Sequence, residues 1–248
     1  MSANKQYMFG IHAVTALIEK HPDRIIRLLA ADERSDKKMQ AILKVARRNG
    51  VEVGEASRAE LDSLTGHGNH QGIAALCVQA RTYSEGDLTE MLEDLTEPAF
   101  FLILDGVQDP HNLGACFRSA DAAGVHAIIA PKDNAVSITP VVSKVACGAA
   151  ETVPFIQVTN IARTIDALKE LGVWIYGAAG EADAAHYKTD FKGSVAVVLG
   201  SEGEGLRRLT REKCDGLVKI PMRGTVESLN VSVATGILLF EVVRQRSK

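Results

Sequence analysis

Three polar, glycine-bearing loops each follow a run of apolar residues in this 248-residue sequence. They read DGVQDPHN at 105–112, GSEGEGL at 200–206 and RGTVESLN at 223–230. Their amides, carboxylates and hydroxyls supply more hydrogen-bonding groups than a structural turn needs, and such groups can orient a reactant or take up a proton. The loops would converge if the strands before them are neighbours in a sheet, so we predict one composite site.

The middle loop has the glycine spacing of a phosphate-binding loop but lacks the Lys-Ser/Thr ending, and the chain contains no GxGxxG. Its carboxylates, Glu202 and Glu204, would repel a polyphosphate and tolerate a ligand that carries a sulfonium or an amine. S-adenosylmethionine therefore fits this loop better than ATP or NAD. The alternative is that the glycines only permit a tight turn between a strand and a helix.

Two of the loops end at an asparagine that we place at a helix start, Asn112 and Asn230. An asparagine oxygen can satisfy an unpaired backbone N–H at that position, and Ser228 could do the same, so capping alone would explain any one of these residues. The helix after Asn112 places its apolar residues on one face, directs Arg118 away from that face and stops at Gly124. Arg118 is thus free to reach solvent or a ligand.

Short apolar runs predict the elements that position these loops. From residue 99 onward the runs FFLILD, VHAIIA, TVPFIQV, VWIYGAA, SVAVVL and LVKI alternate with helical or loop sequence, which predicts a mostly parallel sheet whose strands are buried on both faces. In residues 1–78, Val14, Leu17 and Ile18 have helical spacing and residues 51–53 read as a strand, so this segment reads as a small α/β unit. Between them, residues 79–98 form an acidic connector in which Leu88, Met91, Leu92 and Leu95 predict a short amphipathic helix before Pro98.

Charge and composition limit the classes of partner. The net charge of −3 divides into +2 for residues 1–78, −5 for 79–98 and 0 for the rest, so binding to a nucleic acid would depend on local clusters. The candidate clusters are Lys37 with Lys38, Arg47 with Arg48, and the group Arg207, Arg208, Arg211 and Lys213. Each cluster taken alone is more often a solvated face.

Other features argue for an ordinary soluble protein. The start, MSANKQYMFG, lacks a secretion signal and no apolar run reaches the ~18 residues of a membrane span, so we expect a cytoplasmic location and no membrane partner. The scattered Cys77, Cys116, Cys147 and Cys214 are expected to be reduced core residues. His67 and His70 lack the spacing and neighbours of a metal site, so we expect no metal.

The three loops, in this order, resemble motifs one, two and three of the SpoU (TrmH) branch of the SPOUT RNA ribose methyltransferases. The segments HQGIAAL at 70–76 and GILLFEVVRQR near the end resemble bacterial members that methylate a guanosine of 23S rRNA, so the resemblance covers nearly the whole chain. It implies a SPOUT catalytic domain over residues 99–248, with a C-terminal trefoil knot. It also implies a small RNA-binding domain over residues 1–78, similar to ribosomal protein L30e, in which His70 and Gln71 anchor a loop and Gly72 meets a backbone requirement.

The same resemblance assigns roles to residues and names partners. It implies a catalytic set of Asn112, Arg118, Glu202, Ser228 and Asn230, with the backbone around Gly200, Ile220 and Leu229 holding S-adenosylmethionine. It further implies a homodimer that acts on 23S rRNA or a large-subunit assembly intermediate, at a guanosine ribose in the peptidyl-transferase P loop of that rRNA.

The chemistry leaves alternatives open. Methyl transfer to a ribose needs the 2′-oxygen aligned with the S–CH3 bond and partial removal of its proton. Arg118 is the base that the resemblance implies, but because arginine keeps its charge near pH 7 it could instead hold a phosphate and stabilise the developing alkoxide. Other functions compatible with the sequence are methylation of a tRNA or another rRNA site, a noncatalytic role in ribosome assembly, and, from the strand–helix alternation alone, a nucleotide-dependent oxidoreductase.

Overall fold

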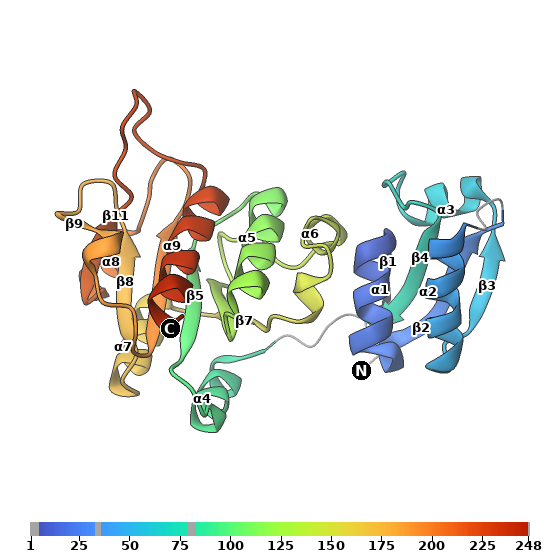
Figure 1. Cartoon of the computed structure of the whole chain (residues 1–248), viewed down its shortest axis with the longest axis horizontal. Coiled ribbons are helices and arrows are strands. Elements are labelled where there is room, and N and C mark those ends of the chain that lie inside the picture. The colour runs from blue at the N-terminus through green and yellow to red at the C-terminus, as the bar shows by residue number, and fades with distance from the viewer. Residues whose placement is uncertain (1–4, 33–35, 79–82, 248) are drawn as a thin grey trace. The chain divides into compact units, whose positions relative to one another are not determined.

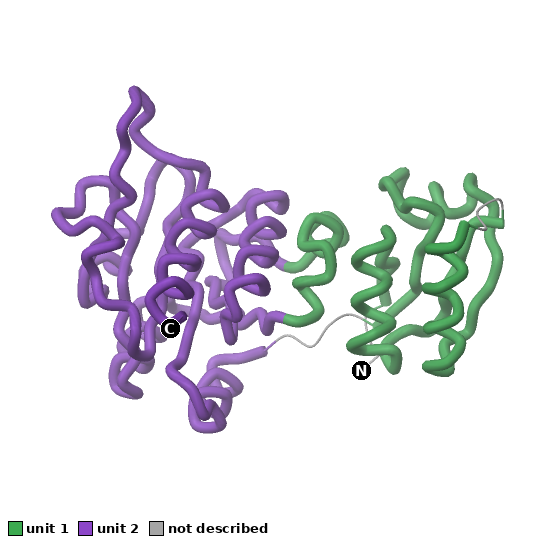
Figure 2. The backbone as a smooth tube through the Cα atoms, in the orientation of Figure 1, with its two compact units in different colours: residues 1–81, 138–152 green, residues 82–137, 153–248 purple. Residues whose placement is uncertain are grey.

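The computed structural model describes residues 5–32, 36–78 and 83–247 and divides into two compact units. Unit 1 comprises residues 1–81 and 138–152, and unit 2 comprises residues 82–137 and 153–248 (Figure 2). The sequence predicted boundaries at residues 78 and 98, and these stay predictions. The local sequence does not indicate that residues 138–152 belong to unit 1, because this depends on their packing against residues more than 100 positions away.

Unit 1 is built on a four-stranded sheet in the order β1-β4-β2-β3, with β1 and β2 antiparallel to β4 and β3 parallel to β2. Its strands are β1 (Lys5–Phe9), β2 (Ile25–Ala31), β3 (Val53–Ala56) and β4 (Ile73–Val78). Its helices are α1 (Ile11–Lys20), α2 (Lys37–Arg48), α3 (Arg58–Leu64) and α6 (Pro140–Val145), with short 3-10 helices η1 (Pro22–Arg24) and η2 (Ala149–Glu151). The strand predicted at 51–53 is observed two residues later.

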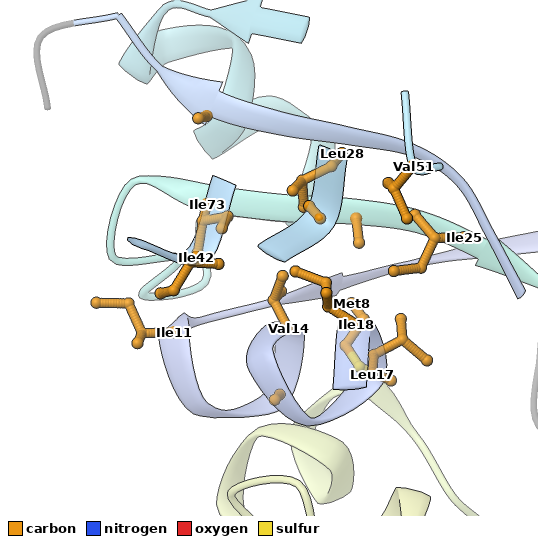
Figure 3. Packing of buried hydrophobic residues seen from close by; sticks show 14 of the residues in the cluster. Met8, Ile11, Val14, Leu17, Ile18, Ile25, Leu28, Ile42, Val51 and Ile73 are labelled. Atoms are coloured by element: carbon orange, nitrogen blue, oxygen red, sulfur yellow. The ribbon is translucent and has the colours of Figure 1, made fainter. Parts of the chain in front are cut away.

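The core of unit 1 lies between the sheet and helices α1 and α2. Val14, Leu17 and Ile18 of α1 are at most 1% exposed, and they meet Leu28 of β2 and Ile73 of β4 (Figure 3). The spacing that predicted α1 is therefore the spacing of its buried face. Glu151 of η2 also belongs to unit 1, where its carboxylate forms a buried ion pair with Arg24.

Unit 2 is built on a seven-stranded sheet in the order β7-β6-β5-β10-β8-β11-β9, in which every named pairing is parallel. Its strands are β5 (Phe100–Asp105), β6 (Ala127–Pro131), β7 (Phe155–Val158), β8 (Trp174–Ala178), β9 (Ala184–Ala185), β10 (Val195–Gly200) and β11 (Gly216–Lys219). The predicted parallel sheet is confirmed. The expectation of burial on both faces holds for β5, β6 and β10 and is wrong for β8 and β11, which are partly exposed.

The helices of unit 2 cover its sheet through alternate residues of the strands. They are α4 (Glu85–Asp94), α5 (Pro110–Ala123), α7 (Ile161–Glu170), α8 (Arg208–Lys213) and α9 (Val231–Arg246), with one 3-10 helix, η3 (His186–Lys188). Phe101 and Ile103 of β5 join an apolar cluster with Leu88 of α4 and Ile165 of α7, which confirms the helix predicted in the connector. The intervening residues of β5 point to the opposite face, and α5 and α9 lie side by side (Figure 1).

Candidate active site

Helix α5 begins three residues earlier than the sequence predicted. Its N-cap is Asp109, whose carboxylate accepts a hydrogen bond of 2.6 Å from the backbone N–H of His111, and Pro110 occupies the first helical position. The expectation that Asn112 stands at the helix start is therefore wrong, because Asp109 already satisfies that end. The Asn112 side chain, 9% exposed, is left for other contacts.

The three polar loops meet through the side chains of Asn112, Glu202 and Asn230. The amide nitrogen of Asn112 donates to Oε1 of Glu202 at 2.9 Å, and the amide nitrogen of Asn230 donates to the same oxygen at 2.6 Å and to Oδ1 of Asn112 at 3.0 Å. The predicted convergence is confirmed. It does not require adjacent strands, because β8 lies between β10 and β11 and the loop at 220–230 crosses that gap.

Asn230 also performs the capping role that the sequence predicted. Its Oδ1 accepts from the backbone N–H of Ser232 at 2.9 Å and from the Ser232 hydroxyl at 2.6 Å, so it is the N-cap of α9. One asparagine thus starts a helix with its oxygen and holds Glu202 with its nitrogen. Since both amide atoms are used, its orientation is fixed before any ligand binds.

The loop after β10 is a closed turn that requires glycine at position 200. Ser201 and Gly205 exchange two backbone hydrogen bonds of 3.1 and 3.0 Å, which return the chain across the end of β10. A Cβ atom at Gly200 would lie 2.0 Å from the backbone carbonyl of Gly205 and 2.3 Å from the nitrogen of Leu206. No side chain fits there, so the tight-turn explanation accounts for Gly200 and the turn also presents Glu202 to its two asparagines.

A buried carboxylate below this turn was missed by the sequence reasoning. Asp105 ends β5 opposite Gly200, is 1% exposed, and accepts a hydrogen bond of 3.1 Å from the backbone N–H of Arg207. Its other oxygen, Oδ1, has no hydrogen-bond partner and lies 3.5 Å from the Arg207 guanidinium. The available signal was an acidic residue closing the otherwise apolar run FFLILD.

A cleft of about 370 Å³ opens beside the three joined side chains. Asn112 and Glu202 line it together with Asp109, Ser201 and Glu204. Three carboxylates around one cleft make it unsuited to a polyphosphate and suited to a polar ligand or a cation. This geometry agrees with the sequence argument against ATP and NAD.

Apart from Gly200 in the turn, four of the predicted site residues lie outside this hydrogen-bonded group. Arg118 is exposed on α5 and forms no ion pair with any described residue. Ser228 is exposed in the loop before α9, and Ile220 and Leu229 are half-buried in the same loop. Their functional roles stay predictions.

The cations at 207–213 do not form a free basic surface. Arg208 pairs with Glu212 at 2.8 Å and Lys213 with Asp166 at 2.7 Å, while Arg211 pairs with Glu181. Arg207 lies against Asp105. Each of these charges has a carboxylate partner, which lowers the value of the cluster as a contact for phosphates.

Three of the four cysteines are unsuited to act as nucleophiles. Burial raises the pKa of Cys77 and Cys116 to about 11 and that of Cys214 to about 12, which keeps these thiols protonated. Cys116 of α5 contacts the Thr235 hydroxyl of α9 at 3.3 Å and so helps to join the two helices. The expectation that all four are core residues is wrong for Cys147, which is exposed in a left-handed turn after α6.

The segment HQG at 70–72 has a structural role in unit 1. The His70 ring contacts Asp62 through Nε2 at 3.1 Å and accepts at Nδ1 from the Gly72 nitrogen at 3.0 Å. Oε1 of Gln71 accepts from the backbone N–H of Ile11 at the start of α1, and Gly72 has φ +77°. The predicted loop anchors and backbone requirement are confirmed. Over residues 5–32, 36–78 and 83–247, no cluster of three or more His, Cys, Asp or Glu side chains could bind a metal ion.

Comparison with known families identifies both parts of the chain. The model of the SpoU rRNA Methylase family matches residues 99–240, and the model of the RNA 2′-O ribose methyltransferase substrate-binding family matches residues 7–83. The chain is 57% identical over 239 residues to the 23S rRNA (guanosine-2′-O-)-methyltransferase RlmB of Shewanella oneidensis, covering 96% of this chain and 97% of that protein. It is 53% identical over 242 residues to RlmB of Escherichia coli K12, covering 98% of this chain and 99% of that protein.

Solved structures share the fold. The crystal structure of an RNA 2′-O ribose methyltransferase superposes with a TM-score of 0.80 at 25% identity, covering 99% of this chain and 90% of that chain. The SpoU methyltransferase AviRb from Streptomyces viridochromogenes, in complex with AdoMet, superposes with a TM-score of 0.81 at 24% identity. The match covers 98% of this chain and 91% of that chain. At that identity the second comparison supports the fold alone. No helix among the described residues has the length and apolar character needed to span a membrane.

Proposed function

Because the chain belongs to the SpoU rRNA methylase family, we propose that it transfers a methyl group from S-adenosylmethionine to the ribose 2′-hydroxyl of a guanosine in 23S rRNA. The observation that carries this proposal is the joining of Asn112, Glu202 and Asn230 beside a cleft, in a chain whose near full-length relatives are named for that reaction. We further propose the peptidyl-transferase P loop of the rRNA as the target, which rests on the resemblance of the N-terminal segment.

The residues around Gly200 suit the cofactor. Gly200 carries no side chain at the end of β10, where the backbone of Gly205 and Leu206 lies close, and Ile220 and Leu229 offer half-buried apolar surface in the neighbouring loop. Glu202 and Glu204 favour a cationic ligand. When bound there, S-adenosylmethionine supplies a methyl group made electrophilic by its sulfonium. The backbone near Gly200, Ile220 and Leu229 is our proposed cofactor site.

Asn112, Glu202 and Asn230 act as positioning groups in this proposal. Each is held by at least one other member, so the wall of the cleft is ordered before RNA enters. Such order lowers the entropic cost of aligning a 2′-oxygen. Ser228, exposed in the same loop, would add a hydrogen bond to the ribose or the cofactor.

Arg118 would act through its permanent charge. It is exposed, and no described carboxylate neutralises its guanidinium, so it is available to hold a phosphate beside the target ribose and to stabilise negative charge on the attacking oxygen. This role needs no loss of its proton. The general-base role would need a neutral guanidine, which is scarce near pH 7.

We include the organisation of the molecule in the proposal. Residues 1–78 would recognise rRNA or a large-subunit assembly intermediate, 79–98 would connect, and 99–248 would transfer the methyl group. The passage of residues 220–230 across β8, and the packing of α9 on α5, fit a trefoil knot. Val233 and Phe240 of α9 are 50% and 48% exposed, and this apolar surface fits a homodimer.

The test is methyl transfer from labelled S-adenosylmethionine to unmodified 23S rRNA, with the product mapped for 2′-O-methylguanosine. We expect one modified guanosine, in the P loop, and loss of transfer in Arg118→Ala. Modification of a different rRNA or of tRNA would show a different substrate within the same family. Binding of cofactor and RNA with no transfer to any RNA would contradict an enzymatic role and indicate a noncatalytic assembly factor.

A further inference from the structure

Helix α2 of unit 1 carries a one-sided set of positive charges. Its buried face consists of Met39, Ile42 and Ala46, and Figure 3 shows Ile42 among the apolar side chains of the core. Its exposed face carries five of the twelve residues as cations, and no Asp or Glu lies within the helix. We name these five residues the α2 basic face: Lys37, Lys38, Lys44, Arg47 and Arg48.

The spacing of these cations places them along one line. Lys37, Lys44 and Arg48 lie seven and then four residues apart, so at about 100° per residue they fall within roughly 40° of one another, opposite the buried face. The line extends about 16 Å at 1.5 Å per residue. Lys38 and Arg47 flank it on either side.

None of the five forms a salt bridge with a described residue, unlike the cations of α8. The nearest comparison within unit 1 is Arg27 of β2, which pairs with Glu52 at 3.4 Å. Exposed lysines and arginines usually have carboxylates within reach, and like charges spaced three or four residues apart, as Lys44 is from Arg47 and Arg48, work against a helix. A partner of opposite charge would remove that repulsion.

Helix electrostatics explains only part of this face. Arg47 and Arg48 stand in the last turn, where cations complement the helix dipole. Lys37 and Lys38 stand in the first turn, where the dipole disfavours them, and Asp36 is used as the N-cap through a bond of 2.9 Å to the Met39 nitrogen. The helix dipole and the N-cap therefore do not explain Lys37 and Lys38.

The chemistry of the face selects the partner. A membrane-binding helix would expose an apolar side as well, but the apolar side of α2 is already buried in the core. A line of lysines and arginines without interleaved acids suits a regular polyanion, and a duplex strand carries a phosphate about every 3.4 Å of its axis. Phosphate contacts fix the position of an RNA without reading its bases.

We propose that the α2 basic face binds backbone phosphates of the substrate RNA and so holds the RNA while unit 2 methylates it. This proposal rests on the proposed function for the identity of the RNA. The face contributes affinity and orientation. Selection of the guanosine is left to other contacts.

The test compares two full-length variants that lose the same charge. The first is Lys37→Gln/Lys44→Gln/Arg48→Gln on α2, and the matched control is Arg208→Gln/Arg211→Gln/Lys213→Gln on α8, where the cations already have partners. The probe is an unmodified 23S rRNA transcript, with its dissociation constant measured from low to high salt. Circular dichroism and the affinity for S-adenosylmethionine verify the fold of each variant.

We expect the α2 variant to bind RNA at least 10-fold more weakly at low salt. Its slope of log affinity against log salt should fall by about 2 to 3, at roughly 0.7 to 0.9 per phosphate contact. The KM for RNA should rise with kcat unchanged, and the α8 control should stay within about twofold of wild type. An α2 variant with wild-type affinity and slope, or an α8 control that loses as much, would overturn the proposal. Failure of the proposed function is a separate result, since it appears as absence of methyl transfer by the wild-type protein.

Discussion

The two units use their polar side chains in opposite ways. In unit 2 the polar groups at the ends of β5 and β10 are bonded to one another, as in the group Asn112, Glu202 and Asn230, and the cations of α8 are paired with carboxylates. In unit 1, the cations of α2 form no salt bridge with any described residue. Groups that must align a reaction gain from being ordered in advance, whereas charges that hold a polyanion need only be exposed. This difference fits our proposals that unit 2 performs the chemistry and that α2 of unit 1 contributes affinity for RNA.

Replacement of Gly200 by alanine should reduce methyl transfer more than any of the other proposed substitutions. The added Cβ would lie 2.0 Å from the Gly205 carbonyl group, so both the end of β10 and the Glu202 turn must shift. Since a displacement of about 1 Å can cost roughly 10²-fold, we expect methyl transfer to fall by more than about 10³-fold, while RNA affinity stays within about twofold. Gly193→Ala, which meets no atom within 4 Å, is the matched control. Normal activity of Gly200→Ala would refute the required turn.

Removal of members of the hydrogen-bonded group should give the next largest effect. For Asn112→Ala and for Asn230→Ala we expect kcat to fall on the order of 10²-fold with the KM for RNA nearly unchanged, because the cleft wall loses its order and the α2 basic face is intact. The double variant should lose less than the product of the two effects, because both residues hold the same Glu202 oxygen. Strictly multiplicative losses would show that the three side chains act separately.

The buried ion pair of Glu151 and Arg24 in unit 1 should matter for stability alone. Glu151 is 8% exposed and pairs with Arg24, whose guanidinium also donates to the Val78 carbonyl at 3.1 Å. Glu151→Gln leaves that guanidinium without its counter-charge, and we expect a loss of about 3 kcal/mol in the free energy of unfolding, measured in urea. Glu52→Gln, in the exposed pair with Arg27, should cost less than about 0.5 kcal/mol. RNA affinity should change in neither variant. A loss of RNA affinity in Glu151→Gln would contradict a role of this pair in stability alone.

The smallest expected effect is a pH dependence located in α9. The hydrogen bond from Arg244, with further donation from Gln245, lowers the pKa of Glu241 from 4.5 to about 2. A lowered folded-state pKa stabilises the protein above the unfolded pKa and this stability is lost as pH falls from about 4.5 toward 2. Because Arg244 is mostly exposed, we expect a contribution on the order of 1 kcal/mol. Denaturation of Glu241→Gln at pH 3 and pH 7 measures it, and an unchanged pH slope would contradict it.

The sequence by itself determined the elements and the chemical character of the loops. Strand β5, the buried face of α5, its stop at Gly124 and the helix α4 all follow from periodicity and capping, which act over a few residues. The three polar loops and their resemblance to a methyltransferase family could also be identified from the sequence, since both depend only on which residue types occur and in which order.

Only the tertiary structure decided which charged and polar groups meet. Sequence could not place Asp105 under the Arg207 backbone, bring Asn230 across β8 to Glu202, or group residues 138–152 with unit 1. The same limit applied to the basic clusters. Arg208 and Glu212 of α8 are only four residues apart, but Lys213 pairs with Asp166 47 positions away, and Lys37 and Lys44 form no salt bridge with any described residue. Pairing across such separations depends on the path of the whole chain, and local sequence carries no record of that path.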